Sequence, residues 1–422
     1  MDTRVKEIVD STKDKFGLGD YYLKTYDFDR KLTVYNETIY SLTMEWFPNH
    51  AKQDDEDLNP AGTAVIEVNI ETRQPIGVIF VMGVTYAKNG VRFQEGSLHE
   101  IVQWVEQQTS LTYQKDFQIK KQAADHIHFH SEVNGIPLTP DGLIEVKWNE
   151  LGQLTSFSVH EPFPKIENVK EDSFTLTLAS IADITKEQIK MLQSPDFDEE
   201  KLIHLYGLEE IYVRDETKET IPFTIMGLAY RQYELEKTLE WSEPLDEAFI
   251  EKDIECKDEV TAEQAFSQEP SPDAYPISKS EQELCVAGVT DFLRKVYPEE
   301  SGHWYIATLH RENGYIQATV KKHQQVEFVF QQKLVAFLDV TEFNVVSYLD
   351  TQSMLAMFDK YAVSNKVVLT KEEAFSKLEP YLELTPYYVY HPAQGEYVLC
   401  GKLDCHYGVD AETREVRPLD DF

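Results

Sequence analysis

The chain has 422 residues, of which 40 are Lys or Arg and 75 are Asp or Glu, so its formal net charge is −35 at pH 7. A field of that sign repels phosphate backbones and anionic lipid, which argues against nucleic-acid binding and favours solubility as the reason for the charge. With 42% hydrophobic and 12% aromatic residues, the composition is that of a folded protein, and the length allows about two or three domains.

The start of the chain and its cysteines favour a cytoplasmic protein without membrane insertion. Residues 1–16 are charged throughout and lack the apolar region of a signal peptide, and the longest apolar run, 76–84, is too short for a membrane span. The four cysteines (Cys256, Cys285, Cys400 and Cys405) show no Cys-x-x-Cys spacing, so we expect reduced thiols.

In chain order, the periodicity first predicts a helix over 2–16, strands near 21–28 and 39–47, and an acidic loop at 54–60 whose residues lack the ligand order of a calcium site. A capping box at Ser97–Glu100 then predicts a helix, followed by strands near 117–119 and 126–132. Further helices are predicted to open at Thr185, after Thr261, at Ser280 and at Thr370. The helix at Ser280 should precede strands near 304–309, 315–320, 326–330 and 334–338, and the helix at Thr370 strands near 387–390, 397–403 and 407–411.

Four short segments each place a polar turn between two extended apolar runs, the pattern of a β-hairpin. They lie at 66–76, 146–154, 213–221 and 409–417. Their unequal spacing argues against a solenoid. Because a lone helix or hairpin cannot bury its apolar face, we expect an α+β fold of repeated units, each a capped helix packed on a small antiparallel sheet.

Composition also predicts the domain boundaries. Residues 241–277 contain several prolines and many acids, which is typical of a linker, and prolines near 162–164 mark a lesser boundary. We therefore expect an N-terminal α+β domain at 1–165, a middle segment at 166–240, a linker at 241–277 and a C-terminal α+β domain at 278–422.

Two stretches carry a family resemblance: Thr370-Lys371-Glu372-Glu373-Ala374 and the closing segment 409–413. They resemble PepSY-like domains and, more narrowly, the YcdB/YcdC repeat proteins of spore-forming bacteria, of which 133–138 with 144–146 and 152–154 looks like the most typical stretch. The resemblance covers about half of the chain. It implies cystatin-like helix-on-meander units and a non-catalytic role, such as inhibiting a protease or binding a protein partner, with no ligand residues to carry over.

One departure from the family concerns the closing turns. Where the family commonly has Gly, this chain has Arg73, Lys218 and Arg414. A left-handed backbone costs a non-Gly residue about 1–2 kcal/mol, so we expect these turns to use another conformation.

His126, His128 and His130 are the best metal candidates, because alternate residues of a strand share one face and a His-x-His pair can supply two zinc ligands. The alternative is a polar outer face on a half-buried strand, which we favour. The cluster Cys400, Cys405 and His406 has acidic neighbours that disfavour a thiolate nucleophile, and the tyrosine runs at 21–26 and 387–390 are more typical of packing than of ligand stacking.

We therefore expect a non-catalytic binding or inhibitory module with a protein or peptide partner, no cofactor and no catalytic residues. Open sheet edges would allow capture of a peptide by strand addition. The alternatives are a metal-dependent hydrolase using the three histidines and a structural, self-associating protein.

Overall fold

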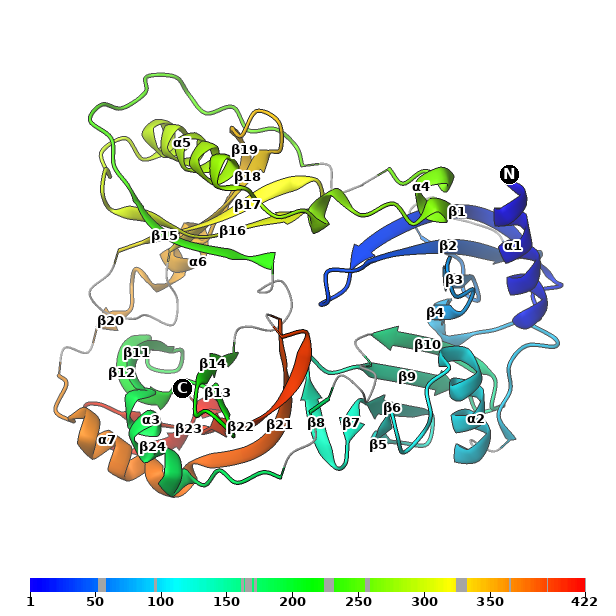
Figure 1. Cartoon of the computed structure of the whole chain (residues 1–422), viewed down its shortest axis with the longest axis horizontal. Helices are drawn as coiled ribbons and strands as arrows, with labels where there is room; N and C mark the ends of the chain where they lie inside the picture. The colour runs from blue at the N-terminus through cyan, green and yellow to red at the C-terminus, as the bar shows by residue number, and fades with distance from the viewer. Residues whose placement is uncertain are drawn as a thin grey trace. The chain divides into compact units, whose positions relative to one another are not determined.

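The computed structural model describes residues 1–51, 58–94, 97–160, 163, 169–170, 173–223, 231–254, 259–323, 332–363, 366–392 and 394–421. The acidic residues 54–57, the expected strand 326–330 and Cys256 lie outside these ranges. The chain forms two compact bodies, each assembled from separate stretches (Figure 1). The first body comprises Met1–Lys170, Asp258–Ala274 and Tyr388–Val398, and the second comprises Glu171–Lys257, Tyr275–Tyr387 and Leu399–Phe422.

Five modules share one order within the described residues: a helix, then four strands that form two antiparallel hairpins. Modules 1 and 2 are α1 (Thr3–Lys15), β1 (Tyr21–Leu32), β2 (Thr38–Pro48), β3 (Ala64–Asn69) and β4 (Pro75–Phe80), then α2 (Leu98–Thr109), β5 (Gln118–Gln122), β6 (His126–His130), β9 (Leu143–Trp148) and β10 (Leu154–His160). Module 3 is α3 (Ala182–Glu187), β11 (Ile189–Asp196), β12 (Lys201–Leu208), β13 (Ile211–Arg214) and β14 (Thr220–Pro222). Module 4 is α5 (Lys279–Val296), β16 (Trp304–Glu312), β17 (Tyr315–Lys322), β18 (Lys333–Asp339) and β19 (Val345–Asp350). Module 5 is α7 (Lys371–Leu378), β21 (Glu383–His391), β22 (Glu396–Asp404), β23 (Tyr407–Asp410) and β24 (Val416–Pro418).

The remaining elements are short or lie between modules. They are β7 (Glu132–Val133), β8 (Ile136–Thr139), α4 (Ala262–Ser267), β15 (Tyr233–Leu239), α6 (Gln352–Leu355), β20 (Ala362–Val363) and 3₁₀ turns that include η1 (Val81–Gly83) and η4 (Leu178–Ile181). The expected α+β architecture of repeated helix-and-sheet units is confirmed. No helix in the described ranges is both long enough and apolar enough to cross a bilayer.

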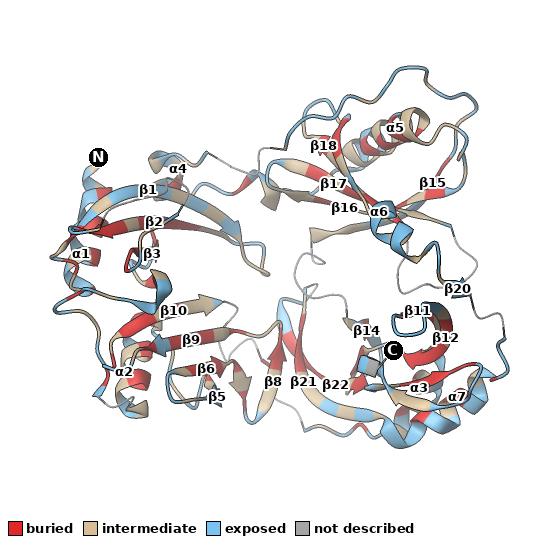
Figure 2. Ribbon diagram, turned by 180° about the vertical axis from the view of Figure 1, so that it is seen from behind, coloured by how far each residue is buried: buried red, intermediate tan, exposed pale blue. Residues whose placement is uncertain are grey.

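In the first body, modules 1 and 2 form one eight-stranded sheet in the order β1-β2-β3-β4-β10-β9-β6-β5. The closing strands β4 and β10 pair antiparallel, so each module supplies half of the sheet. One apolar core joins α1, through Val5 and Ile8, and α2, through Ile101 and Val105, to the sheet. Buried residues follow the inner strands such as β2 and β9, while β1 at the edge is mostly exposed or intermediate (Figure 2).

In the second body, modules 3 and 5 pair through equivalent strands. β12 of module 3 pairs with β23 of module 5, and β13 pairs with β22. The second strand of each module thus pairs with the third strand of the other. This reciprocal pattern is that of a two-fold relationship. The apolar core of these modules includes Ile189 and Val213 from one and Leu378 and Val409 from the other.

Module 4 packs α5 across a five-stranded sheet in the order β15-β16-β17-β18-β19. The helix buries Cys285, Val289 and Phe292 on one side, at the spacing of one helical face. At Gly288 the helix approaches the β18–β19 turn so closely that an added Cβ would lie 2.0 Å from the Phe343 carbonyl oxygen.

The four predicted hairpins are all present, as β3–β4, β9–β10, β13–β14 and β23–β24. A fifth, β18–β19, closes module 4 and was not predicted as a hairpin from its sequence. The helix at Thr370 begins with the expected reciprocal capping box. Two helix starts were predicted wrongly: α5 is capped by Ser278 instead of Ser280, and α3 spans Ala182–Glu187, so Thr185 lies inside the helix instead of opening it.

The prediction for the closing turns was also wrong. Arg73, Lys218 and Arg414 have φ values of 60°, 59° and 66°, which is left-handed backbone. In each turn the amide of this residue donates to a carbonyl four residues earlier. Side-chain contacts accompany the strain: Lys218 Nζ donates to the Ser180 carbonyl at 3.0 Å, and an Arg414 guanidinium nitrogen donates to the Val368 carbonyl at 3.0 Å.

Residues 241–277 are a linker by composition, yet the structure packs both ends of this stretch. Trp241 Nε1 donates to the Pro298 carbonyl at 2.9 Å, and the Phe249 ring lies 5.0 Å from that of Phe292 on α5. Further on, α4 follows the capping box at Thr261, as expected, and its Phe266 ring lies 6.0 Å from Phe28 of β1. Within this stretch, a few aromatic side chains therefore provide the packing contacts.

Candidate functional site

The three histidines proposed as metal candidates share one face of β6, while Ile127 and Phe129 between them are fully buried. Each imidazole lies beside a different carboxylate: His126 2.8 Å from Asp125, His128 2.7 Å from Glu145 and His130 3.3 Å from Glu132. Burial acts to raise the pKa of Glu145, but Lys147 and His128 outweigh it and hold that pKa below its usual value. No cluster of three potential metal ligands occurs in the part of the chain that the structure describes.

The thiols are packed into the interior. Cys285, Cys400 and Cys405 are free and buried. Burial raises the pKa of Cys285 and of Cys400 to about 12, and it raises the pKa of Cys405 as well. Since the thiolate is the nucleophilic form, these three side chains are protonated packing groups at neutral pH.

The tyrosines of the two aromatic runs have different surroundings. Tyr21 is buried and its hydroxyl accepts a hydrogen bond from the Tyr86 amide at 2.9 Å, and Tyr388 is also buried. Tyr390, on the same strand as Tyr388, lines a cavity of the first body. That cavity is the candidate functional site.

The cavity lies where several strands of the eight-stranded sheet begin or end, and we call it the sheet-end cavity. It has two compartments, of about 730 Å³ and about 190 Å³, whose walls share Asn69, Ile76 and Val159. The large compartment is bounded by the β3–β4 turn, the C-terminus of α2, the β1–β2 turn and the tip of the β21–β22 hairpin. Its volume is in the range of pockets that hold small molecules or short peptide segments.

The end of α2 forms one wall of the large compartment. Gln108, Thr109 and the left-handed cap residue Ser110 all line it. Gln108 is only 5% exposed, and its Oε1 has no hydrogen-bond partner among the described residues. An unpaired buried oxygen of this kind costs about 1–3 kcal/mol, and because it is closed off from the cavity as well as from solvent, this cost falls on the stability of the fold.

Three tyrosines form a second wall. The Tyr35 and Tyr397 hydroxyls lie 2.9 Å apart, and the Tyr390 ring lies 4.9 Å from Tyr35 and 5.3 Å from Tyr397. Burial raises the pKa of Tyr390, and the nearby Glu37 carboxylate raises it further. Tyr390 therefore stays neutral at physiological pH.

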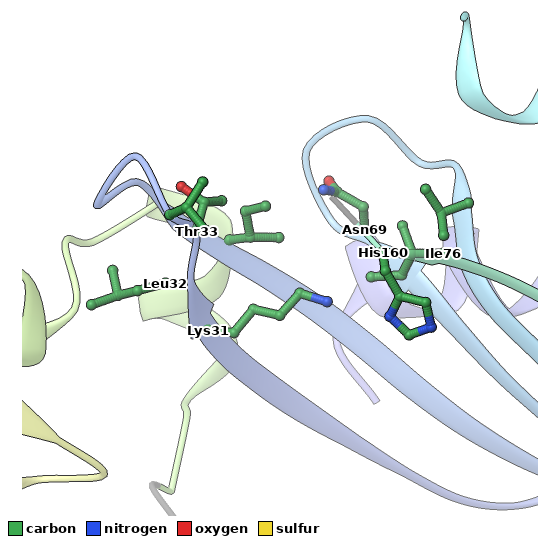
Figure 3. A pocket seen from close by; sticks show the side chains of 9 residues that line it. Lys31, Leu32, Thr33, Asn69, Ile76 and His160 are labelled. Atoms are coloured by element: carbon green, nitrogen blue, oxygen red, sulfur yellow. The ribbon is translucent and has the colours of Figure 1, made fainter. Parts of the chain in front are cut away.

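The small compartment has a different polarity. Lys31 and His160 both line it, with the apolar side chains of Leu32 and Ile39. Figure 3 shows the Lys31 chain extending from the end of β1 towards the side on which Asn69 and His160 lie. A hydrogen-bond donor with positive charge thus lies in one compartment, while the carboxylate of Glu37 lies in the other.

Of the residues that line the sheet-end cavity, the sequence analysis considered only Tyr390 as a candidate for ligand contact, and it favoured a packing role for that side chain. A signal for Gln108 was present: it continues the apolar face of α2 marked by Ile101 and Val105, where a polar residue is out of place. Tyr35, Glu37 and Tyr397 meet only through tertiary contacts, because 360 or so positions separate the two turns that carry them.

The comparisons with known proteins add one structural likeness. No protein-family model matches the sequence, and no curated protein matches it. Among solved structures, the chain is similar to the Bacillus megaterium YpeB C-terminal domain with a TM-score of 0.24 and 9% sequence identity. The match covers 52% of this chain and 96% of that one.

Proposed function

We propose that this chain is a non-catalytic binding module that receives a peptide segment in the sheet-end cavity. The observation that carries the proposal is the cavity itself: its large compartment has about 730 Å³, it shares three lining residues with a smaller compartment, and both are lined by polar and apolar side chains. Such a lining combines shape with a few placed polar groups, as ligand sites do.

The two compartments together match the chemistry of a peptide. A peptide presents both N–H donors and carbonyl acceptors, and the cavity offers the Glu37 carboxylate on one side and Lys31 on the other. Ile76 and Val159, which line both compartments, supply apolar contact between these polar ends. An inhibitory role towards a protease, which the PepSY-like resemblance implies, is one form that such binding would take.

The test is equilibrium dialysis of the full chain against a mixture of randomised tetrapeptides, half with free and half with acetylated N-termini, with retained peptides counted by mass spectrometry. We expect the wild-type chain to retain a subset, and Val159→Trp, which fills both compartments, to lose at least about 90% of that retention. Ser158→Trp is the matched control, because Ser158 is the neighbouring residue of β10 and does not line the cavity.

Retention by the wild-type chain and by Ser158→Trp, but not by Val159→Trp, supports the proposal. Absence of retained peptide from the wild-type chain overturns it, and so does equal retention by all three proteins. Thermal unfolding of both variants establishes that they are folded, so that a loss is assigned to the cavity.

A further inference from the structure

The eight-stranded sheet of the first body has a second face, opposite the one on which α1 and α2 pack. Because side chains alternate along a strand, the residues between the buried core positions point to this other face, which we call the open face. Its centre includes Ile79 of β4 and, on β10, Ser156 and Ser158. Ile79 is 54% exposed, and the short hydroxyl side chains beside it leave the sheet open to close approach.

The half of the open face that β1, β2 and β3 form is acidic. Four carboxylates and two lysines give it a net charge of −2: Asp27, Asp29, Glu45, Glu67, Lys24 and Lys31. Asp27 and Asp29 are exposed on the edge strand β1. The Glu45 and Glu67 carboxylates accept hydrogen bonds from hydroxyl groups of the neighbouring strands. This half therefore presents negative charge to a partner of the open face.

The half that β5, β6 and β9 form carries the three imidazoles of β6, which we call the histidine stripe: His126, His128 and His130. Around the stripe, β5, β9 and the adjoining loops and strands contribute three lysines and four carboxylates: Lys120, Lys121, Lys147, Asp125, Glu132, Asp141 and Glu145. With neutral imidazoles this half has a net charge of −1. Histidine is the side chain whose charge ordinarily changes between about pH 8 and pH 5, and three added protons turn −1 into +2.

Acidification thus makes the two halves of one face complementary. A two-fold axis parallel to the strands, between β4 and β10, lays β5 and β6 of one copy over β1 and β2 of a second copy. The positive half of each copy then faces the negative half of the other. Near the axis Ile79 of each copy faces β10 of the other, which gives the arrangement an apolar centre within a charged rim, as protein interfaces have.

The open face is large enough for a specific dimer. Eight strands spaced by about 4.8 Å, each contributing about five residues at 3.4 Å, cover roughly 650 Å² on each copy. The two copies together would bury about 1,300 Å², within the range of about 1,200–2,000 Å² for specific interfaces.

We propose that the open face is a self-association surface on which two copies of this chain pair below about pH 6, when the histidine stripe is protonated. At neutral pH both halves of the face are negative and the chain, with its formal charge of −35, repels its copy. The dimer does not rest on the proposed peptide binding, because its contacts are made by the strand faces and not by the sheet-end cavity.

The experiment is sedimentation velocity of the full chain at about pH 5.5 and about pH 7.5, at one ionic strength. We expect the wild-type chain to have the mass of a dimer at the lower pH and of a monomer at the higher pH. The stripe variant His126→Gln/His128→Gln/His130→Gln should remain a monomer at both, because its halves cannot become complementary.

The matched control is His99→Gln/His303→Gln/His406→Gln. It removes three exposed imidazoles that lie outside the eight-stranded sheet, so its total charge changes as that of the stripe variant does. This control should form dimers like the wild-type chain. It separates pairing by the open face from the general loss of repulsion that acid causes in an acidic protein.

Asp27→Asn tests the acidic half with a single exposed substitution. Since each contact occurs twice in a two-fold dimer, it should raise the dissociation constant at the lower pH about threefold to tenfold. Asp10→Asn, which removes an exposed carboxylate of α1 on the opposite side of the sheet, should leave that constant unchanged.

A wild-type chain with one and the same mass at both pH values overturns the inference, whether that mass is a monomer's or a dimer's. Dimers of the stripe variant at the lower pH overturn it too, as does an equal loss of dimers in the three-histidine control. Thermal unfolding at both pH values establishes that each variant is folded. If the stripe variant does not fold, Asp27→Asn decides, and a dissociation constant equal to that of Asp10→Asn refutes the pairing.

Discussion

Gly288 of α5 lies against the turn that closes its module, and this contact makes a sharp prediction about stability. In an exposed helix, replacing Gly by Ala stabilises by about 1 kcal/mol, because Ala loses less conformational entropy. Here the added Cβ would lie 2.0 Å from the Phe343 carbonyl oxygen, whereas ordinary contacts at such positions are 3.4–4 Å. The turn would therefore have to move by more than an ångström.

Moving that turn has a cost on two counts. Overpacking a close contact costs about 1–3 kcal/mol, and Phe343 is already in left-handed backbone with φ of 55°. Because the overlap exceeds an ångström, the overpacking cost should fall at about 2–3 kcal/mol. After the gain of about 1 kcal/mol in helix propensity, the expected net effect of Gly288→Ala is a loss of about 1–2 kcal/mol in the free energy of unfolding. Urea unfolding followed by the fluorescence of buried Trp304, which belongs to the same module, measures it.

Ala287→Gly provides the control from the neighbouring position of the same helix. Ala287 is exposed, so the change should cost about 1 kcal/mol through propensity alone. Both substitutions should then destabilise, although they exchange the same two residues in opposite directions. A Gly288→Ala protein as stable as the wild type, or more stable, would refute the close approach of helix and turn.

Gln108→Leu should raise the free energy of unfolding of the ligand-free chain by about 1 kcal/mol in urea titrations, because it removes a buried oxygen without a partner. A loss of stability would contradict this reasoning. Arg414→Ala should cost about 1 kcal/mol by the same measurement, since the left-handed strain remains while the contact to the Val368 carbonyl is lost. Arg414→Gly should have a stability near that of the wild type, because it loses the same contact but relieves the strain. A large loss of stability in the Gly variant would mean that the strain is unimportant. Hydrogen bonds from Thr341 and from the Glu342 amide hold the pKa of Asp339 below its usual value, so the stability it contributes is fully present above about pH 5 and is lost as the pH falls from the unfolded-state pKa through the lower folded-state pKa. Asp339→Asn should therefore flatten the fall in stability between pH 5 and pH 3, and an unchanged pH profile would count against the assignment.

Many helices and strands were predictable because the apolar spacing within each module indicates them locally. The apolar spacing of Val5, Ile8 and Val9 predicts α1, and the alternation around Ile127 and Phe129 predicts β6 with its histidines on one face. Local sequence does not report which modules pair. Nothing in β4 or β12 by itself distinguishes a strand that closes an eight-stranded sheet from one that pairs with β23.

The turns illustrate a second limit. Arg73 and Arg414 were expected to avoid left-handed backbone because the intrinsic cost is known, but the compensation comes from distant residues. An Arg73 guanidinium lies 5.4 Å above the Phe266 ring of α4, almost 200 positions away in the chain. The candidate site shares this limit, because its walls come from five separate stretches and only Gln108 was out of place within its own helix.

The first body includes two late stretches of chain, and this has a consequence for the order in which the protein is made. Ribosomes add about 5–20 residues per second, so residues 388–398 emerge about 10–50 seconds after the sheet of modules 1 and 2. Until then Tyr35 has neither Tyr390 nor Tyr397 beside it, and the large compartment lacks a wall. The large compartment is therefore complete only after residues 388–398 have left the ribosome.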